Sequence, residues 1–351
     1  MFTKDFLNFN LLSDFTIVYS EKIPGRGEDA YSCSINDKSS YVGVFDGVGG
    51  SGAKKYACLY NHTGAYIASR QVALSVKNWF EHTVTDSCNL PNNDLVSCFS
   101  EESAGTLKRK IKDSLSILNA KLSSSQQLKL KSSFSKEFPT TMSSIVVVPE
   151  YRQNPEGESG FDYNVSCYWA GDSRSYYLDQ NGLHQITNDD TDVEDALDNI
   201  YADGLMNNVI YHVGDNSRNR NQDFVINYKR LVLNGKFITF ATTDGCFGYI
   251  SSPMEFEYYL LECLMNSDSV QQFNNNLHSL FKKYAEDDFS FAGLIYGYES
   301  FEDVKEYFKE RFQTMKAMCE DILELEKTKG KVDTRKEIWL QSYKDDYCKY
   351  L

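Results

Sequence analysis

Four groups of acidic residues lie beside glycines or after short apolar runs, where carboxylates can act together. They are Gly27-Glu28-Asp29-Ala30, Asp46-Gly47-Val48-Gly49-Gly50, Asp244-Gly245 and Asp287-Asp288. Magnesium and manganese ions prefer carboxylate, carbonyl and water oxygens as ligands. These residue types therefore favour the binding of hard divalent cations.

Two of these groups repeat one local design. Asp46 follows the apolar run 41–45, and the glycines after it allow a sharp turn that exposes a carbonyl beside the carboxylate. Asp244 follows the run 237–241, with two threonines between. Asp-Gly is also a common turn dipeptide, so each motif alone is more often a plain turn. Only the joint occurrence of the motifs at strand ends favours a site.

The order of the acidic groups, with Gly171-Asp172-Ser173-Arg174 between the second and the third, resembles the metal-dependent protein phosphatase family, also called protein phosphatase 2C or PPM. The resemblance covers roughly residues 14–298, and Val48 within the second motif is similar to bacterial members. It implies hydrolysis of phosphoserine or phosphothreonine on proteins by a water that bridges two metal ions.

The resemblance also assigns roles to single residues. Asp46 would bridge two divalent cations, Mn or Mg, and the Gly47 carbonyl and Glu28 would complete one of the two sites. Asp244 and Asp287 would be ligands at the other site. The family's cofactor is therefore expected to be a pair of ions held by oxygen ligands.

Three further residues take roles from the same resemblance. Asp29 is similar to an acid that holds water behind the ligands, and Asp172 to an acid at a third, looser metal site. Many members carry a phosphate-binding arginine four residues before the glutamate, where this chain has Pro24. Arg26 is the candidate replacement, because a guanidinium binds phosphate in a bidentate way. Arg174 is expected to form a structural ion pair.

These motifs need strands that end near one another. Apolar, β-branched runs at 41–45, 143–148, 164–170, 236–241 and 289–296 predict strands, and helical spacing predicts helices within 56–80 and 107–130. The expected fold class is α+β, and the resemblance implies two antiparallel sheets packed as a sandwich and flanked by helices. The expected catalytic domain is 14–298.

Residues 299–351 are expected to form a C-terminal helical extension. Apolar residues recur there at steps of three and four from Phe301 to Ile322, which predicts an amphipathic helix. The stripe suits docking on the main domain, or contact with another chain through 299–325. Residues 188–223, dense in Asn, Asp and Gly, are expected to be a loop that affects the choice of substrate.

Charge and composition limit the classes of partner and the compartment that we expect for this protein. The net charge of −14 argues against nucleic acid and anionic membranes. The nine cysteines show no Cys-x-x-Cys pair, and no long apolar run is present, so a cytoplasmic protein is expected. The resemblance implies a phosphorylated protein substrate and a cognate Ser/Thr kinase pathway.

Two alternatives remain open from the sequence. One is a catalytically weak or inactive relative that binds a phosphoprotein or another ligand, which the missing arginine and the divergent 188–223 loop suggest. The other is a two-metal hydrolase acting on nucleic acid or on a small phosphoester. The acidic charge of the chain argues against a polyanionic substrate.

Overall fold

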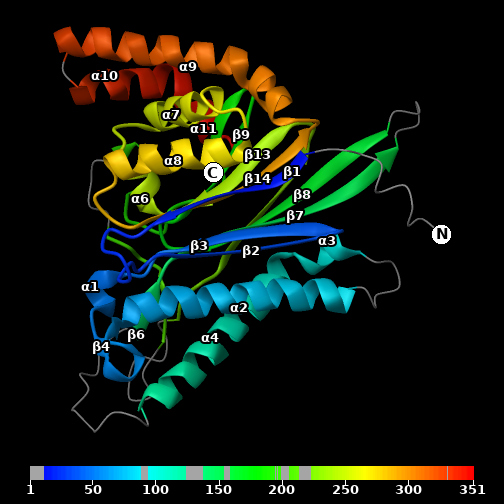
Figure 1. Cartoon of the computed structure of the whole chain (residues 1–351), viewed down its shortest axis with the longest axis vertical. Helices are drawn as coiled ribbons and strands as arrows, with labels where there is room; N and C mark the ends of the chain where they lie inside the picture. The colour runs from blue at the N-terminus through cyan, green and yellow to red at the C-terminus, as the bar shows by residue number, and fades with distance from the viewer. Residues whose placement is uncertain are drawn as a thin grey trace.

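The computed structural model describes residues 12–87, 94–123, 137–153, 159–193, 195, 197–198, 205–212, 223–329 and 331–351. Two five-stranded antiparallel sheets lie face to face at the centre, with helices on both outer faces (Figure 1). The described residues therefore form the α+β sandwich that the sequence predicts.

Each sheet is built from strands that are distant in sequence. Sheet A has the order β1-β14-β13-β9-β10 and sheet B the order β12-β8-β7-β3-β2. The bounds in sheet A are β1 (Leu12–Ser20), β9 (Arg174–Asp179), β10 (Gly182–Gln185), β13 (Phe237–Thr242) and β14 (Phe289–Tyr298). Those in sheet B are β2 (Ala30–Asn36), β3 (Ser39–Phe45), β7 (Met142–Gln153), β8 (Ser159–Ala170) and β12 (Asn227–Asn234). Two small pairs join β4 (Lys55–Tyr56) to β5 (His62–Thr63) and β6 (Glu137–Thr140) to β11 (Ile210–His212).

Helices cover both sheets (Figure 1). The long helices α2 (Gly64–Ser87) and α4 (Glu101–Ser123) lie on the side of sheet B, and α7 (Pro253–Met265), α8 (Val270–Tyr284) and α9 (Phe301–Lys329) on the side of sheet A. The shorter ones are α1 (Gly49–Gly52), the 3-10 turn η2 (Ala57–Leu59), α3 (Leu95–Cys98), α6 (Asp244–Phe247), α10 (Lys331–Ile338), the π-helical turn η3 (Trp339–Tyr343) and α11 (Lys344–Tyr347).

Side chains that point alternately to the two faces of each strand explain how the layers are held together. Tyr41 and Phe45 of β3 pack in the core beneath α2 and α4, whereas Val42 and Val44 pack in the core between the sheets. Successive side chains of a strand point to opposite faces, so one buried strand contributes to two cores. A third core joins sheet A to α7, α8 and the C-terminal helices.

The amphipathic helix expected after residue 299 is α9, and its apolar stripe packs on this chain. Val304, Phe308, Met315 and Ile322 are buried in the core that α9 shares with α7 and α8. This confirms docking of the stripe. The proposed division at residue 298 falls between β14 and α9, and it remains a prediction.

One observed helix begins later in the sequence than predicted. The helix predicted within 56–80 begins only at Gly64, after β4, η2 and β5. Tyr60 and Asn61 have positive φ angles of 55° and 62°, a left-handed backbone that no α-helix can continue through. Among the described residues, no helix is long and apolar enough to cross a membrane. No disulfide links the cysteines in the described part of the chain.

Candidate active site

The acidic groups found in the sequence lie at one end of the sandwich. Asp46 follows β3 and Glu28 precedes β2, and these neighbouring strands run antiparallel, with Ala30 opposite Phe45. In sheet A, Asp244 follows β13 and Asp287 precedes β14, its antiparallel neighbour. The antiparallel order therefore brings the acids of each sheet to one edge.

Asp172 joins the two edges. It lies in the turn between β8 of sheet B and β9 of sheet A, and Gly171 before it has a φ of +98°. In register, Ala170 lies opposite Met142 and Arg174 opposite Thr242, so the turn meets the strand ends of both sheets. The two sheets therefore contribute carboxylates to the same region.

The Asp46 turn is fixed by its backbone. The Asp46 carbonyl accepts hydrogen bonds from the Thr141 amide and from Thr140 Oγ1, both at 2.7 Å. A Cβ on Gly47 would lie 2.6 Å from the Ala65 carbonyl oxygen, so only glycine fits this position without a shift. Thr140 and Thr141 therefore hold the backbone of the Asp46 turn in place.

Glu28 is fastened to the same turn. Its carbonyl accepts a hydrogen bond from the Gly47 amide at 3.2 Å, and its carboxylate accepts one from Thr63 Oγ1. A Cβ on Gly49 would lie 2.3 Å from Glu28 Oε2. The glycines after Asp46 thus make room for the Glu28 carboxylate, which explains why the two motifs occur together.

Asp288 ties the fourth motif to the first. Its Oδ2 accepts a hydrogen bond from the Glu28 amide at 2.5 Å, and its carbonyl would lie 2.0 Å from a Cβ on Gly245. The carboxylate of Asp287 accepts a hydrogen bond from the Asp288 amide at 2.9 Å, and Asp287 is exposed. Asp288 therefore positions the loop, and Asp287 is the exposed acid of the pair.

Asp29 lies behind these residues, with only 1% of its surface exposed. Its Oδ2 accepts a hydrogen bond from Thr243 Oγ1 at 2.8 Å. The Thr243 hydroxyl also accepts one from the Ser290 amide at 2.9 Å. Asp29 therefore connects the start of β2 to the residue just before Asp244.

Like charges crowd this end of the sandwich. Burial and the carboxylates of Asp29, Asp244 and Asp172 raise the pKa of Asp46 well above its usual range. Burial and Asp244 also raise the pKa of Asp29 to about 8 and that of Asp172 to about 7. Burial and Asp287 raise the pKa of Asp244 as well. A cation among these carboxylates would relieve their repulsion.

The donor set fits hard divalent cations, although the side chains do not form a ready-made metal site. Within the described residues, no group of three or more His, Cys, Asp or Glu side chains could hold an ion as it stands. The buried Oδ1 of Asp172 accepts no hydrogen bond within the described part of the chain. A buried carboxylate oxygen without a donor is costly, and an ion would satisfy it. The expected ligand set remains a prediction.

Arg174 is the buried cation nearest in sequence to Asp172. It is 1% exposed, and its Nε and Nη2 donate to the carboxylate of Asp189 at 2.9 and 2.6 Å. This bidentate pair confirms the structural ion pair expected for Arg174. Its partner Asp189 comes from the segment after β10.

The phosphate-binding arginine expected at Arg26 is exposed on the loop before Glu28. The guanidinium whose charge lowers the pKa of Glu28 is instead Arg70, on α2, although burial raises that pKa overall. Arg70 is held by Tyr66, whose ring lies 3.4 Å from its Cζ, and by Tyr19. No local motif surrounds Arg70 in the sequence, so its place beside the site could not be predicted.

Tyr249 is a second residue that the motifs did not indicate. It is 40% exposed, and burial followed by the charges of Asp244 and Asp287 raises its pKa. An exposed aromatic ring this close to the acidic end lies at the edge of the candidate site. Its position five residues after Asp244 is the only signal in the sequence.

Comparison with known proteins supports the fold. No protein-family model and no curated protein matches the chain. Among solved structures, the serine/threonine phosphatase Stp1 from Staphylococcus aureus matches with a TM-score of 0.52 and 18% identity, over 81% of this chain and 94% of that chain. The catalytic domain of the serine/threonine phosphatase PstP, in complex with two manganese ions, matches with a TM-score of 0.47 and 15% identity, over 82% and 99%. The chain therefore has the two-sheet fold of Stp1, and the expected fold class is confirmed.

Proposed function

We propose that this chain is a metal-dependent phosphatase that removes phosphate from phosphoserine or phosphothreonine on proteins. The observation that carries the proposal is the meeting of carboxylates from both sheets at one end of the sandwich, where their charges raise one another's pKa. When these buried acids ionise, their charges need a counter-charge, and oxygen donors select hard divalent cations.

Glu28, Asp46, the Gly47 carbonyl, Asp244 and Asp287 would hold two Mn or Mg ions, and Asp172 would serve a third, looser site. When bound, such ions lower the pKa of water to make a nucleophile and neutralise charge on the phosphoryl oxygens. The chain itself holds the ligands in place through hydrogen bonds to the Asp46 backbone and to Asp29.

The substrate would bind at the acidic end. Arg26 is proposed as a phosphate contact, because it is exposed on the loop that leads to Glu28. Arg70 has both terminal nitrogens engaged, with Nη1 bonded to the Tyr66 carbonyl at 3.2 Å and Nη2 to Tyr19 Oη at 3.2 Å. Arg70 is therefore less available to bind phosphate than Arg26. A protein substrate agrees with the net charge of −14, which repels nucleic acid.

The test is phosphate release from a phosphothreonine peptide with Mn2+, with Mg2+ and with EDTA. We expect release to require the metal and to fall at least about a hundredfold in Asp46→Asn and Asp244→Asn, because each loses a charged ligand. Asp37→Asn, on the exposed turn between β2 and β3, is the matched control and should keep wild-type activity.

The alternative is a relative that binds a phosphoprotein without hydrolysing it. The observation that favours it is that the exposed Arg26 side chain has no hydrogen bond or ion pair among the described residues, together with Pro24 at the family's arginine position. Folded wild-type protein that releases no phosphate with either metal, but still binds the phosphopeptide, would establish this alternative and refute the phosphatase.

A further inference from the structure

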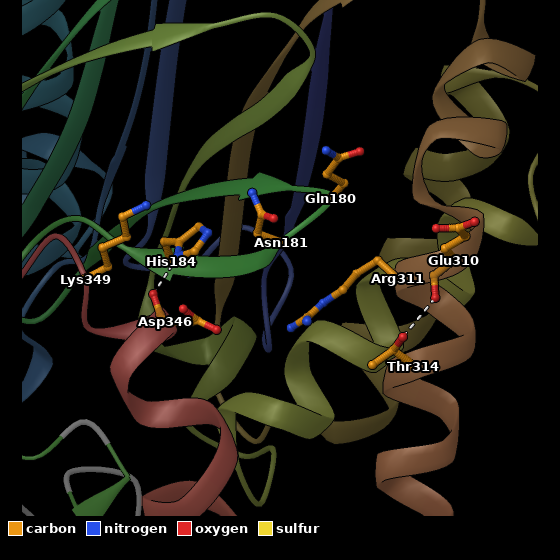
Figure 2. Close-up of a pocket in the computed structure, with 8 residues that line it drawn as sticks. All are labelled: Gln180, Asn181, His184, Glu310, Arg311, Thr314, Asp346 and Lys349. Carbon is orange, nitrogen blue, oxygen red and sulfur yellow. Dashed lines mark hydrogen bonds between the residues drawn. The ribbon is translucent and has the colours of Figure 1, made fainter.

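The C-terminal helices contact the part of the chain that lies between the acidic motifs. Figure 2 shows the seam, where the β9–β10 hairpin faces α9 and the end of the chain across a polar cavity of about 550 Å3. His184 of β10 hydrogen-bonds through Nδ1 to the Asp346 carbonyl at 2.5 Å. Arg311, which reaches from α9 toward the hairpin, is already paired with Glu257 at 2.6 Å. At this seam, side chains of the C-terminal helices thus pack against the β9–β10 hairpin of the same chain.

A buried chain of hydrogen bonds runs inward from this seam. The Tyr347 hydroxyl on α11, 1% exposed, donates to Gln185 Oε1 at 2.9 Å. Gln185 Nε2 donates to Asp189 Oδ1 at 3.3 Å. Asp189 in turn holds Arg174, two residues from Asp172. Three side-chain contacts therefore lead from the C-terminal helix to the Asp172 turn.

A second connection reaches the same segment further along. Lys344 Nζ lies 2.7 Å from Asp195 Oδ2, and the Trp339 indole donates to that oxygen at 3.4 Å. Lys336 pairs with Asp198 at 3.1 Å. These contacts attach the residues after β10 to the C-terminal helices from outside.

The same segment is fastened to the Asp172 turn from inside. The Asp190 amide donates to the Gly171 carbonyl at 3.0 Å, and Asp190 Oδ2 accepts from the Gly171 amide at 2.9 Å. Asp189 and Asp190 thus hold both ends of the Gly171–Arg174 turn. The segment lies between this turn and the C-terminal helices and contacts both.

We propose that the C-terminal extension is a positioning element for the acidic site, with Tyr347 and Lys344 as positioning residues. They hold residues 189–193, 195, 197 and 198 against the Gly171–Arg174 turn and so fix where Asp172 lies. The consequence for catalysis rests on the proposed function, whereas the positioning of the Gly171–Arg174 turn by the C-terminal helices does not. The ligand whose binding would depend on this element is a divalent cation.

The physical reason is the cost of an unpaired buried group. Replacing Tyr347 by Phe leaves the Gln185 Oε1 atom without the donor that it has, in a place where water is excluded. Gln185 then reorients or admits water, and Asp189 loses one of its donors. Groups that orient metal ligands from behind commonly change metal affinity by about tenfold or more when removed.

The experiment compares Tyr347→Phe and Lys344→Met with matched controls from the same segment. Tyr350→Phe removes a hydroxyl, and Lys349→Met removes an exposed charge; neither group has a hydrogen bond or ion pair within the described residues. Hydrogen exchange is measured on the metal-free protein, and Mn2+ affinity by calorimetry. The Mn2+ concentration for half-maximal phosphate release is measured with kcat and KM.

We expect faster exchange at 171–175 and 189–198 in Tyr347→Phe and, more weakly, in Lys344→Met. We also expect about tenfold weaker binding of Mn2+ at the looser Asp172 site in Tyr347→Phe, with KM for the peptide little changed and kcat recovered at saturating metal. Both controls should match the wild type.

Unchanged exchange in Tyr347→Phe and Lys344→Met would overturn the proposal. Faster exchange with wild-type Mn2+ affinity would also overturn it, since the contact would then be only structural. Wild-type protein that binds Mn2+ but releases no phosphate would refute the phosphatase alone, and the exchange and binding data would still decide the positioning role. Wild-type protein that binds no Mn2+ would overturn both.

Discussion

The stability of the metal-free protein should fall as pH rises, and Mn2+ should reduce this dependence. The acid that sets the pH range is Asp29. Its burial and the charge of Asp244 raise its pKa to about 8. In the unfolded chain an aspartate titrates near pH 4. Between these values the folded protein binds more protons than the unfolded chain, so its free energy of unfolding decreases with increasing pH.

The magnitude follows from the pKa of Asp29. Each pH unit between folded and unfolded pKa corresponds to about 1.4 kcal/mol, so this acid alone costs on the order of 5 kcal/mol by pH 8. Asp46, Asp172 and Asp244 share the same repulsion, so their contributions do not simply add. About 4 kcal/mol of this cost falls between pH 5 and 8. With an unfolding entropy of about 0.7 kcal/mol/K for a chain of this length, the melting temperature should drop by roughly 5 °C over that range.

The assay is thermal unfolding across that pH range, with EDTA or with Mn2+ at about a hundred times its dissociation constant. Mn2+ at this concentration adds about 2.7 kcal/mol, or roughly 4 °C, and adds most at high pH, where the carboxylates have lost their protons. Asp46→Asn should show a shallower decrease with EDTA and little response to Mn2+. Equal pH dependence with and without Mn2+ would refute the placement of a cation among these acids.

Three substitutions test single contacts. Gly47→Ala, whose Cβ would meet the Ala65 carbonyl, should lower stability by about 1–3 kcal/mol and weaken Mn2+ binding, whereas Gly50→Ala, with open space around it, should do neither in parallel melting and calorimetry. Arg174→Met should cost about 3–5 kcal/mol in denaturant unfolding, because it leaves a buried carboxylate unpaired; a loss below 1 kcal/mol would contradict the ion pair. Arg26→Ala should raise KM for a phosphopeptide about tenfold with kcat nearly kept, and an unchanged KM would remove Arg26 from the site.

The acidic motifs could be found in the sequence because each is local. Asp46 and Asp244 come directly after buried strands, and the glycines beside them are needed within the same turn. A short apolar run followed by Asp-Gly carries this information in a few residues. Four of the five predicted strands therefore lie within observed strands, the fifth begins one residue before β13, and the fold class follows from them.

Other parts of the structure leave no local signal. The edge strand β12 is largely half-exposed, so it lacks the apolar run by which central strands are found. Arg70 and Thr243 approach Glu28 and Asp29 from other elements, over separations that a single sequence does not specify. The role of Tyr347 was missed for the same reason, because its partner Gln185 is 162 residues away.

The site should be coupled to the packing between the sheets, because its carboxylates come from both. Asp46 is placed by sheet B and Asp244 by sheet A, and the residues that set the spacing of the sheets include Val44 and Ala241 in the core between them. An ion held by both acids would bind the aligned sandwich and not the unfolded chain, so binding would stabilise that alignment. Because linkage is reciprocal, whatever loosens the packing between the sheets must weaken metal binding, even far from any ligand. The position of Asp172 should be the most sensitive to this loosening, because its turn crosses from one sheet to the other. Residues 189 and 190 hold that turn in place.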